Sequence, residues 1–184
     1  MQKPNSLRVK VVTNLGRALG IGCYFIGTVV RSRSLRALGL PSVAERNFRR
    51  KNYDSACLHA VELLQLVETD PNDWNYGNAV HYGHLMLGRV AVVRGDLKKA
   101  EAELLAAARV PASPQLASFG PNMQLALELL QAGREQCVLE YFALCEKFWE
   151  TGKRQLRTWS DDIKNGRQPV FGGNLFYYRN HRAA

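Results

Sequence analysis

The strongest constraint on the fold of this chain is a glycine break inside a long helical pattern that covers residues 81–114. Apolar and small residues recur at helical spacing on both sides of the break, which has the sequence Arg94-Gly95-Asp96. Gly95 can adopt the left-handed conformation that ends a helix, and Asp96 can accept hydrogen bonds from the first amides of the next helix. The segment therefore predicts a helix hairpin, with Gly88 where a larger side chain would hold the two helices apart.

The same segment resembles a tetratricopeptide repeat, a helix-turn-helix unit of about 34 residues. The resemblance rests on a Leu-Gly pair, a Gly-Asp-Leu turn, and small, large and small apolar residues in the second helix, namely Leu87-Gly88, Gly95-Asp96-Leu97, Ala100, Leu104 and Ala107. It implies an all-α fold in which consecutive hairpins stack side by side. Proteins of this family are more often binding scaffolds than enzymes.

Weaker versions of the pattern flank the central unit. Before it, a break at residues 38–42 and a capping box at Ser42 and Glu45 predict a short basic helix, about 42–50. An apolar stripe over residues 53–67 then predicts the second helix of that pair. After the central unit, Ala132-Gly133-Arg134 repeats the hairpin break between two further apolar stripes.

These segments predict an all-α protein, a TPR-like α-solenoid of about three stacked hairpins. We expect a basic, glycine-rich N-terminal arm (residues 1–41), a TPR-like repeat domain (42–150), and a C-terminal capping helix with an aromatic tail (151–184). The capping helix is expected at about 153–165, and a polar outer face there would keep the stack soluble. Some aromatic residues of the tail are expected to pack on the body, and the alternative is that they dock elsewhere.

The glycine-rich stretch of residues 11–30 is ambiguous. Its uninterrupted apolar and small residues, Ala18 to Val30, fall short of the roughly 20 residues that a helix needs to span a bilayer. A soluble helix packed on the first hairpin is the favoured interpretation, and a segment that anchors in or lies on a membrane is the alternative. If it spans, the arginines after it would keep the repeat body in the cytoplasm. We therefore expect a cytoplasmic protein, or else a membrane-anchored adaptor with a cytoplasmic body.

The basic residues of the chain are concentrated at its ends. Residues 1–51 contain eleven Lys and Arg and a single acid, Glu45, whereas residues 52–151 contain more acids than bases. Such an arm suggests an anionic partner, and nucleic-acid binding through it is one possible function. Aromatic residues are not interleaved with these arginines, apart from Tyr24, Phe25 and Phe48, so nucleic acid is the less favoured partner.

Catalytic signatures are not recognisable in the sequence. It shows no nucleophile elbow, no glycine-rich phosphate loop and no converging carboxylates, so we predict neither an enzyme, nor a cofactor, nor a small-molecule substrate. His81 and His84 have a spacing that could hold a metal, but the sequence supplies no third ligand at a recognisable spacing, and packing histidines are the favoured interpretation. The four cysteines form no C-x-x-C pair and are expected to be free thiols.

The family resemblance implies a concave groove lined by the first helix of each hairpin. Carried onto this chain, it directs Tyr82, Leu85 and Arg89 toward the groove, with Met123 and Leu127 from the following unit. The lysines and asparagines with which some family members clamp a terminal carboxylate are not visible. An apolar helix or an extended peptide is therefore the expected ligand.

A second candidate binding element is the proline-stiffened segment 113–122. It places the amides of Gln115 and Asn122 beside Phe119 at the start of a helix, where free backbone amides can bind an anion. The favoured alternative is that Ser118 or Asn122 caps this helix while Phe119 fills the core. The function predicted from the sequence is a non-catalytic scaffold that binds a protein or peptide in its groove.

Overall fold

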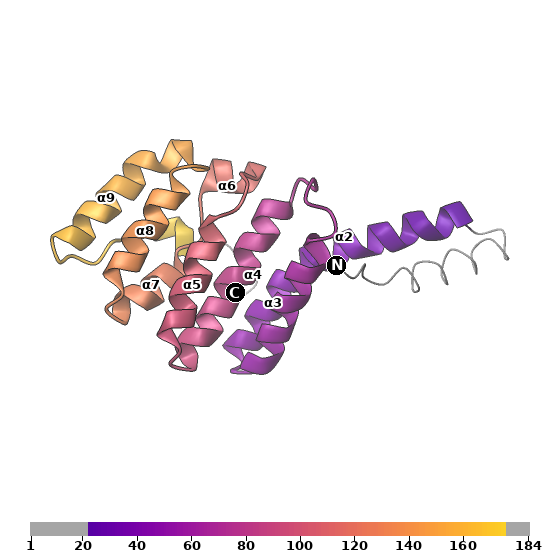
Figure 1. Cartoon of the computed structure of the whole chain (residues 1–184), viewed down its shortest axis with the longest axis horizontal. Coiled ribbons are helices and arrows are strands. Elements are labelled where there is room, and N and C mark those ends of the chain that lie inside the picture. Colours follow the sequence, from indigo (N-terminus) through magenta and orange to yellow (C-terminus); the bar gives the residue numbers. More distant parts are fainter. Residues whose placement is uncertain (1–21, 176–184) are drawn as a thin grey trace, which may run out of the picture. The chain divides into compact units, whose positions relative to one another are not determined.

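The computed structural model describes residues 22–175, and the side chains of residues 35–175 (Figure 1). This part of the chain contains eight α-helices and no strand. The helices are α2 (Gly22–Arg49), α3 (Tyr53–Val67), α4 (Tyr76–Val93), α5 (Leu97–Ala108), α6 (Pro114–Phe119), α7 (Gln124–Gln131), α8 (Glu135–Cys145) and α9 (Lys153–Lys164). Two short 3-10 helices lie at Glu150–Gly152 and Gly172–Leu175. The chain divides into two compact units, residues 1–38 and 39–184, and helices α3 to α9 all lie in the second.

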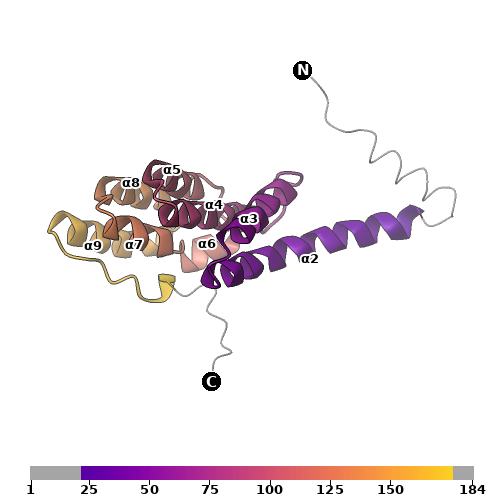
Figure 2. The ribbon, with the colours of Figure 1, turned by 90° about the horizontal axis from the view of Figure 1, so that it is seen from below.

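Consecutive helices pack as pairs in this second unit. α4 packs against α3, α5 and α7, while α5 also packs against α8, and α8 packs against α9. Seen from below, α5 and α8 form one layer, and α4 and α7 lie beneath them in another (Figure 2). The prediction of an all-α fold built from helix pairs is thus confirmed.

The ends of the predicted hairpins have the expected backbone geometry. Gly95 has a φ of +78°, and the Asp96 side chain accepts a hydrogen bond from the Lys99 amide at 3.0 Å. Gly133 ends α7 in the same left-handed conformation, with a φ of +72°. At both turns the next amide donates back to a carbonyl five residues earlier, which is the pattern of a Schellman motif. Both hairpin breaks are therefore confirmed.

The predicted break at residues 38–42 is wrong, because α2 continues through Pro41 to Arg49. A proline inside a helix removes one hydrogen bond and costs about 3 kcal/mol. Leu40 and Ala44 are only 5% and 2% exposed, and a continuous helix places both on one face because they lie four residues apart. Burial of this face offsets the cost, so Ser42 and Glu45 do not form a capping box.

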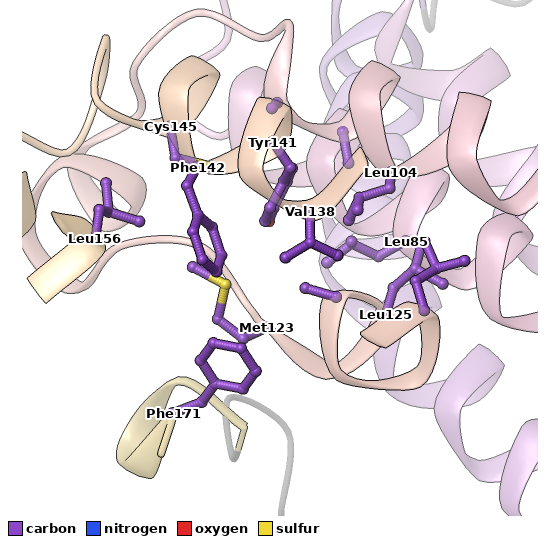
Figure 3. Close-up of a cluster of buried hydrophobic side chains, with 14 of the residues drawn as sticks. Leu85, Leu104, Met123, Leu125, Val138, Tyr141, Phe142, Cys145, Leu156 and Phe171 are labelled. Atoms are coloured by element: carbon purple, nitrogen blue, oxygen red, sulfur yellow. The ribbon is translucent and has the colours of Figure 1, made fainter. Parts of the chain in front are cut away.

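The C-terminal segment packs back on the body, as expected for part of the aromatic tail. Phe171 is buried, and its ring meets the Trp159 and Phe142 rings edge to face, at 5.0 and 6.2 Å. Figure 3 shows Phe171 next to Met123 and below Phe142, which comes from α8. The Asn174 side chain donates to the carbonyls of Phe119 and Pro121, and ties this segment to the loop between α6 and α7. The C-terminal helix predicted at about 153–165 is also present, as α9.

Two glycines make room for the indole of Trp149. A Cβ at Gly120 would lie 2.3 Å from Cε2 of that ring, and a Cβ at Gly152 would lie 2.1 Å from Cδ2. Gly120 has in addition a φ of +77°, which side chains disfavour. The core between α6, α8 and α9 therefore depends on the absence of side chains at these two positions.

We expect Gly120→Ala to lower the free energy of unfolding by about 3 kcal/mol, since it adds both a clash with Trp149 and backbone strain. Gly173→Ala is the matched control, because a Cβ there would meet no atom within 4 Å. Urea unfolding followed by circular dichroism measures both. Equal midpoints for the two variants would contradict the packing described for Trp149.

Candidate functional site

The candidate site is a depression of about 600 Å³ in the unit of residues 39–184. It is lined by the C-terminal half of α2, by residues of α3 and α4, by the start of α7 and by Leu175. The first helix of each of three successive pairs, α2 with α3, α4 with α5 and α7 with α8, thus contributes to one surface. Its apolar lining includes Phe48, Tyr53, Leu63, Tyr82, Met86 and Leu175, and its polar lining includes Glu45, Arg49, Lys51, Arg89, Asn122 and Gln124.

Four of the seven binding residues predicted from the sequence line this depression, namely Tyr82, Leu85, Arg89 and Asn122. The other three, Met123, Leu127 and Gln115, do not. Met123 is fully buried in the core, and Leu127 is half-buried and packs against the same core. Gln115 is exposed on α6. The site therefore lies on α4 and its neighbours and does not extend to α6.

The predicted helix start near residue 122 has a different geometry from the one expected. Ser118 lies inside α6 and so does not cap the helix that follows residue 122, whereas Ser113 caps α6 itself by accepting a hydrogen bond from the Leu116 amide at 3.2 Å. The N-cap of α7 is Met123, which makes no side-chain capping bond, while Asn122, one residue earlier, accepts a hydrogen bond from the Gln124 amide at 2.8 Å. The expectation that Phe119 fills the core is wrong, because its side chain is 65% exposed. Gly120 ends α6, and the chain becomes buried at Gly120 and Pro121, directly after Phe119.

The sequence did not point to the contribution of α2. Glu45 and Phe48 lie three residues apart on one face of that helix, and Gln124 lies at the start of α7. The helical spacing of Ala44, Glu45 and Phe48 is the signal that could have identified this face. The family resemblance does not indicate it, because the groove positions that it implies come from the central hairpin and the unit after it.

Arg89 is the centre of the site. From α4, its Nη1 donates to Glu45 of α2 and its Nε to Glu128 of α7, both at 2.8 Å. Its guanidinium carbon also lies 4.1 Å from the ring centroid of Phe48, in a cation-π contact. The side chain is 13% exposed. Both carboxylate partners of Arg89 thus come from within the fold. Its ion pairs join the first helices of all three pairs, α2, α4 and α7.

Glu128 depends on this arrangement. Its Oε1 accepts hydrogen bonds from Arg89 and from the Gln124 amide group, whereas its Oε2 is buried and accepts none from the described residues. A buried carboxylate with an incomplete set of partners is stabilised mainly by the opposite charge beside it. Removal of Arg89 would leave that carboxylate uncompensated.

His81 is a structural residue at the edge of the depression. Its ring is fully buried, with Nδ1 2.7 Å from the carbonyl of Ala107, while Nε2 accepts a hydrogen bond from the Asn122 amide at 3.2 Å. Nε2 must therefore be unprotonated, and Nδ1–H donates to Ala107. Burial lowers the pKa of His81 to about 4. The neutral ring joins α4 to the end of α5 and to the start of α7.

The histidines and cysteines near the site are paired or buried. The described residues contain no group of three or more His, Cys, Asp or Glu that could hold a metal ion. His84 is paired with Glu103, at 2.7 Å. Burial raises the pKa of Cys137 to about 11 and that of Cys145 well above its usual value, so neither thiol ionises near neutral pH. These groups serve packing and pairing within the fold.

None of the described helices combines the length and the apolar composition that crossing a membrane requires. The ambiguous stretch of residues 11–30 lies mostly outside the described residues.

Comparisons with protein-family models, with curated proteins and with solved structures found no match to this chain.

We expect the Arg89→Met variant to be destabilised by about 3 kcal/mol, because it leaves Glu45 and Glu128 without their common partner. The double variant Arg89→Met with Glu128→Gln should recover part of this loss, since the buried negative charge is then removed as well. Chemical denaturation of the four proteins in this cycle measures the coupling. Strict additivity would contradict the bridge described for Arg89.

Acid should destabilise the protein through His81. Because the folded pKa is about 4 and the ordinary value is 6.5, the unfolded chain takes up the proton first as the pH falls. Stability should therefore decrease between pH 6.5 and 4, by about 3 kcal/mol from this residue. His81→Gln should flatten that part of the stability profile, whereas His59→Gln, at a half-buried histidine of α3, should not. An unchanged profile in His81→Gln would refute this assignment.

Proposed function

We propose that this protein is a non-catalytic scaffold of stacked, tetratricopeptide-like hairpins that binds a protein or peptide segment in the depression. The packing of α4 on α7 and of α5 on α8 supports the stacking, since first helices meet first helices and second helices meet second helices. We also propose that the protein is located in the cytoplasm. The family resemblance itself continues to rest on residues 81–114.

The observation that carries the proposal is the composition of the depression. Three first helices converge on it, and its volume lies in the range of about 300–1,000 Å³ that is typical of ligand pockets. Aromatic and aliphatic side chains are interspersed with polar groups, which suits an apolar side chain presented by a helix or an extended strand. The buried His81 and the Arg89 bridge fix the three helices around this space before any ligand arrives.

Preorganisation of this kind favours binding over catalysis. The charged groups at the centre, Arg89, Glu45 and Glu128, are paired with one another, so they shape the pocket rather than act on a substrate. A rigid pocket lowers the entropic cost that a ligand must overcome on binding. The ion pairs of Arg89 also help to hold α2, α4 and α7 in one relative position, which contacts between small apolar side chains alone would define less well.

The test is a selection of linear 12-residue peptides displayed on phage against the immobilised full-length chain, followed by measurement of Kd for synthetic copies. We expect peptides whose affinity falls about tenfold or more in Tyr82→Ala, because an aromatic wall of the pocket is removed. Leu58→Ala is the matched control, since Leu58 is 68% exposed on α3 and does not line the depression. A selection that yields no peptide sensitive to Tyr82→Ala would refute the proposal.

A further inference from the structure

We propose that the segment bound in the depression is acidic, with Asp or Glu residues next to an apolar anchor, and that Lys51 at the rim recognises its negative charge. This inference rests on the proposed function and deepens it. Two observations carry it, the distribution of paired and unpaired charges at the end of α2 and the backbone conformation of Lys51.

The carboxylates of the site are already neutralised. Glu45 pairs with Arg89 and with Arg49, both at 2.8 Å, and Glu128 pairs with Arg89. At the end of α2, by contrast, Arg46, Arg50 and Lys51 are exposed and form no ion pair among the described residues. Of these three residues Lys51 lines the depression, so the uncompensated charge at its rim is positive and favours a ligand of opposite sign.

Lys51 occupies a backbone position that favours glycine. Its φ is +61°, and it is the one non-glycine residue with a positive φ in the described chain. The Lys51 and Asn52 amides donate to the carbonyls of Phe48 and Asn47, both at 2.9 Å, which is the same pair of bonds that closes α4 at Gly95 and α7 at Gly133. Those turns have glycine where α2 has lysine, so the lysine side chain is present at an energetic cost.

The position of Lys51 links this cost to the site. It lines the depression together with Arg49, next to the aromatic residues Phe48 and Tyr53. Residues in strained backbone conformations are concentrated at functional sites, where the strain is part of how the site works. A cationic group beside an apolar pocket is suited to a peptide that carries an acidic residue next to its anchor.

The surroundings of Phe48 favour a peptide over a nucleic acid. Single-stranded nucleic acids bind largely by stacking bases on open aromatic faces. One face of Phe48 is covered by the Arg89 guanidinium, and Tyr53 meets the same ring edge to face at 5.3 Å. At Phe48 at least one ring face is therefore occupied within the fold, which suits a wall for an inserted side chain better than a platform for a stacked base.

The experiment uses the peptides selected on the full-length chain and variants of Lys51. We expect the peptides to be enriched in Asp and Glu beside an apolar residue, and their Kd to rise when NaCl is increased from about 50 to 500 mM. Lys51→Gly should weaken binding about three- to tenfold and yet raise Tm by about 2–4 °C, because it removes the charge and relieves the strain. Lys51→Arg should retain the affinity, and Lys98→Ala, at an exposed lysine of α5, should leave the affinity unchanged.

Four results would overturn the inference. Peptides that depend on Tyr82 but lack acidic residues, or that bind Lys51→Gly with unchanged affinity, would refute it and leave the proposed function standing. A selection with no Tyr82-dependent peptide would refute both. Displacement of the peptides by a 12-nucleotide oligothymidylate that itself binds more tightly, and less tightly to Lys51→Gly, would show that the rim serves nucleic acid instead.

Discussion

The site depends on a single cation placed between two carboxylates. Arg89 is on α4, and its partners Glu45 and Glu128 come from helices that precede and follow it by 44 and 39 residues. Small residues such as Ala44, Ala56 and Ala60 allow the helices around it to approach closely, but they offer little directional preference. A guanidinium that bridges two carboxylates adds that direction, because its donors lie in a fixed plane. The relative placement of the three first helices is therefore determined at the same residue that forms the wall of the depression.

Local signals in the sequence predicted the local structure well. Gly95 and Asp96, like Gly133, determine a turn through their own backbone and side-chain chemistry, and the structure has these turns where they were expected. Pro41 shows the limit of such reasoning. Its preference to end a helix is overridden because Leu40 and Ala44 must both be buried, and that requirement comes from helices distant in the sequence. The fold class could thus be predicted, but the extent of α2 could not.

The candidate site was predicted in part for a similar reason. Tyr82, Leu85 and Arg89 lie on a long helix whose phase is clear from the sequence, and they line the depression. Met123 lies one residue before α7 begins, where the chain has not yet adopted the helical phase, and its side chain turns into the core. The ion pairs of Arg89 join residues with no sequence relationship to one another. A pattern within one segment cannot reveal such contacts, which depend on the complete tertiary arrangement.

The C-terminal segment has a consequence for how the chain folds during synthesis. Phe171 completes the aromatic core against Phe142 and Trp159, and Asn174 holds the loop that leads into α7. Helices α3 to α5 can form and pair as soon as they leave the ribosome, since their contacts are between neighbours in sequence. The core around α8 and α9 gains its last aromatic contacts only after residues 171–174 have emerged as well. Until this segment has been synthesised, the Phe142 and Trp159 rings lack the aromatic partner that covers them in the complete fold, which leaves apolar surface open to intermolecular contact.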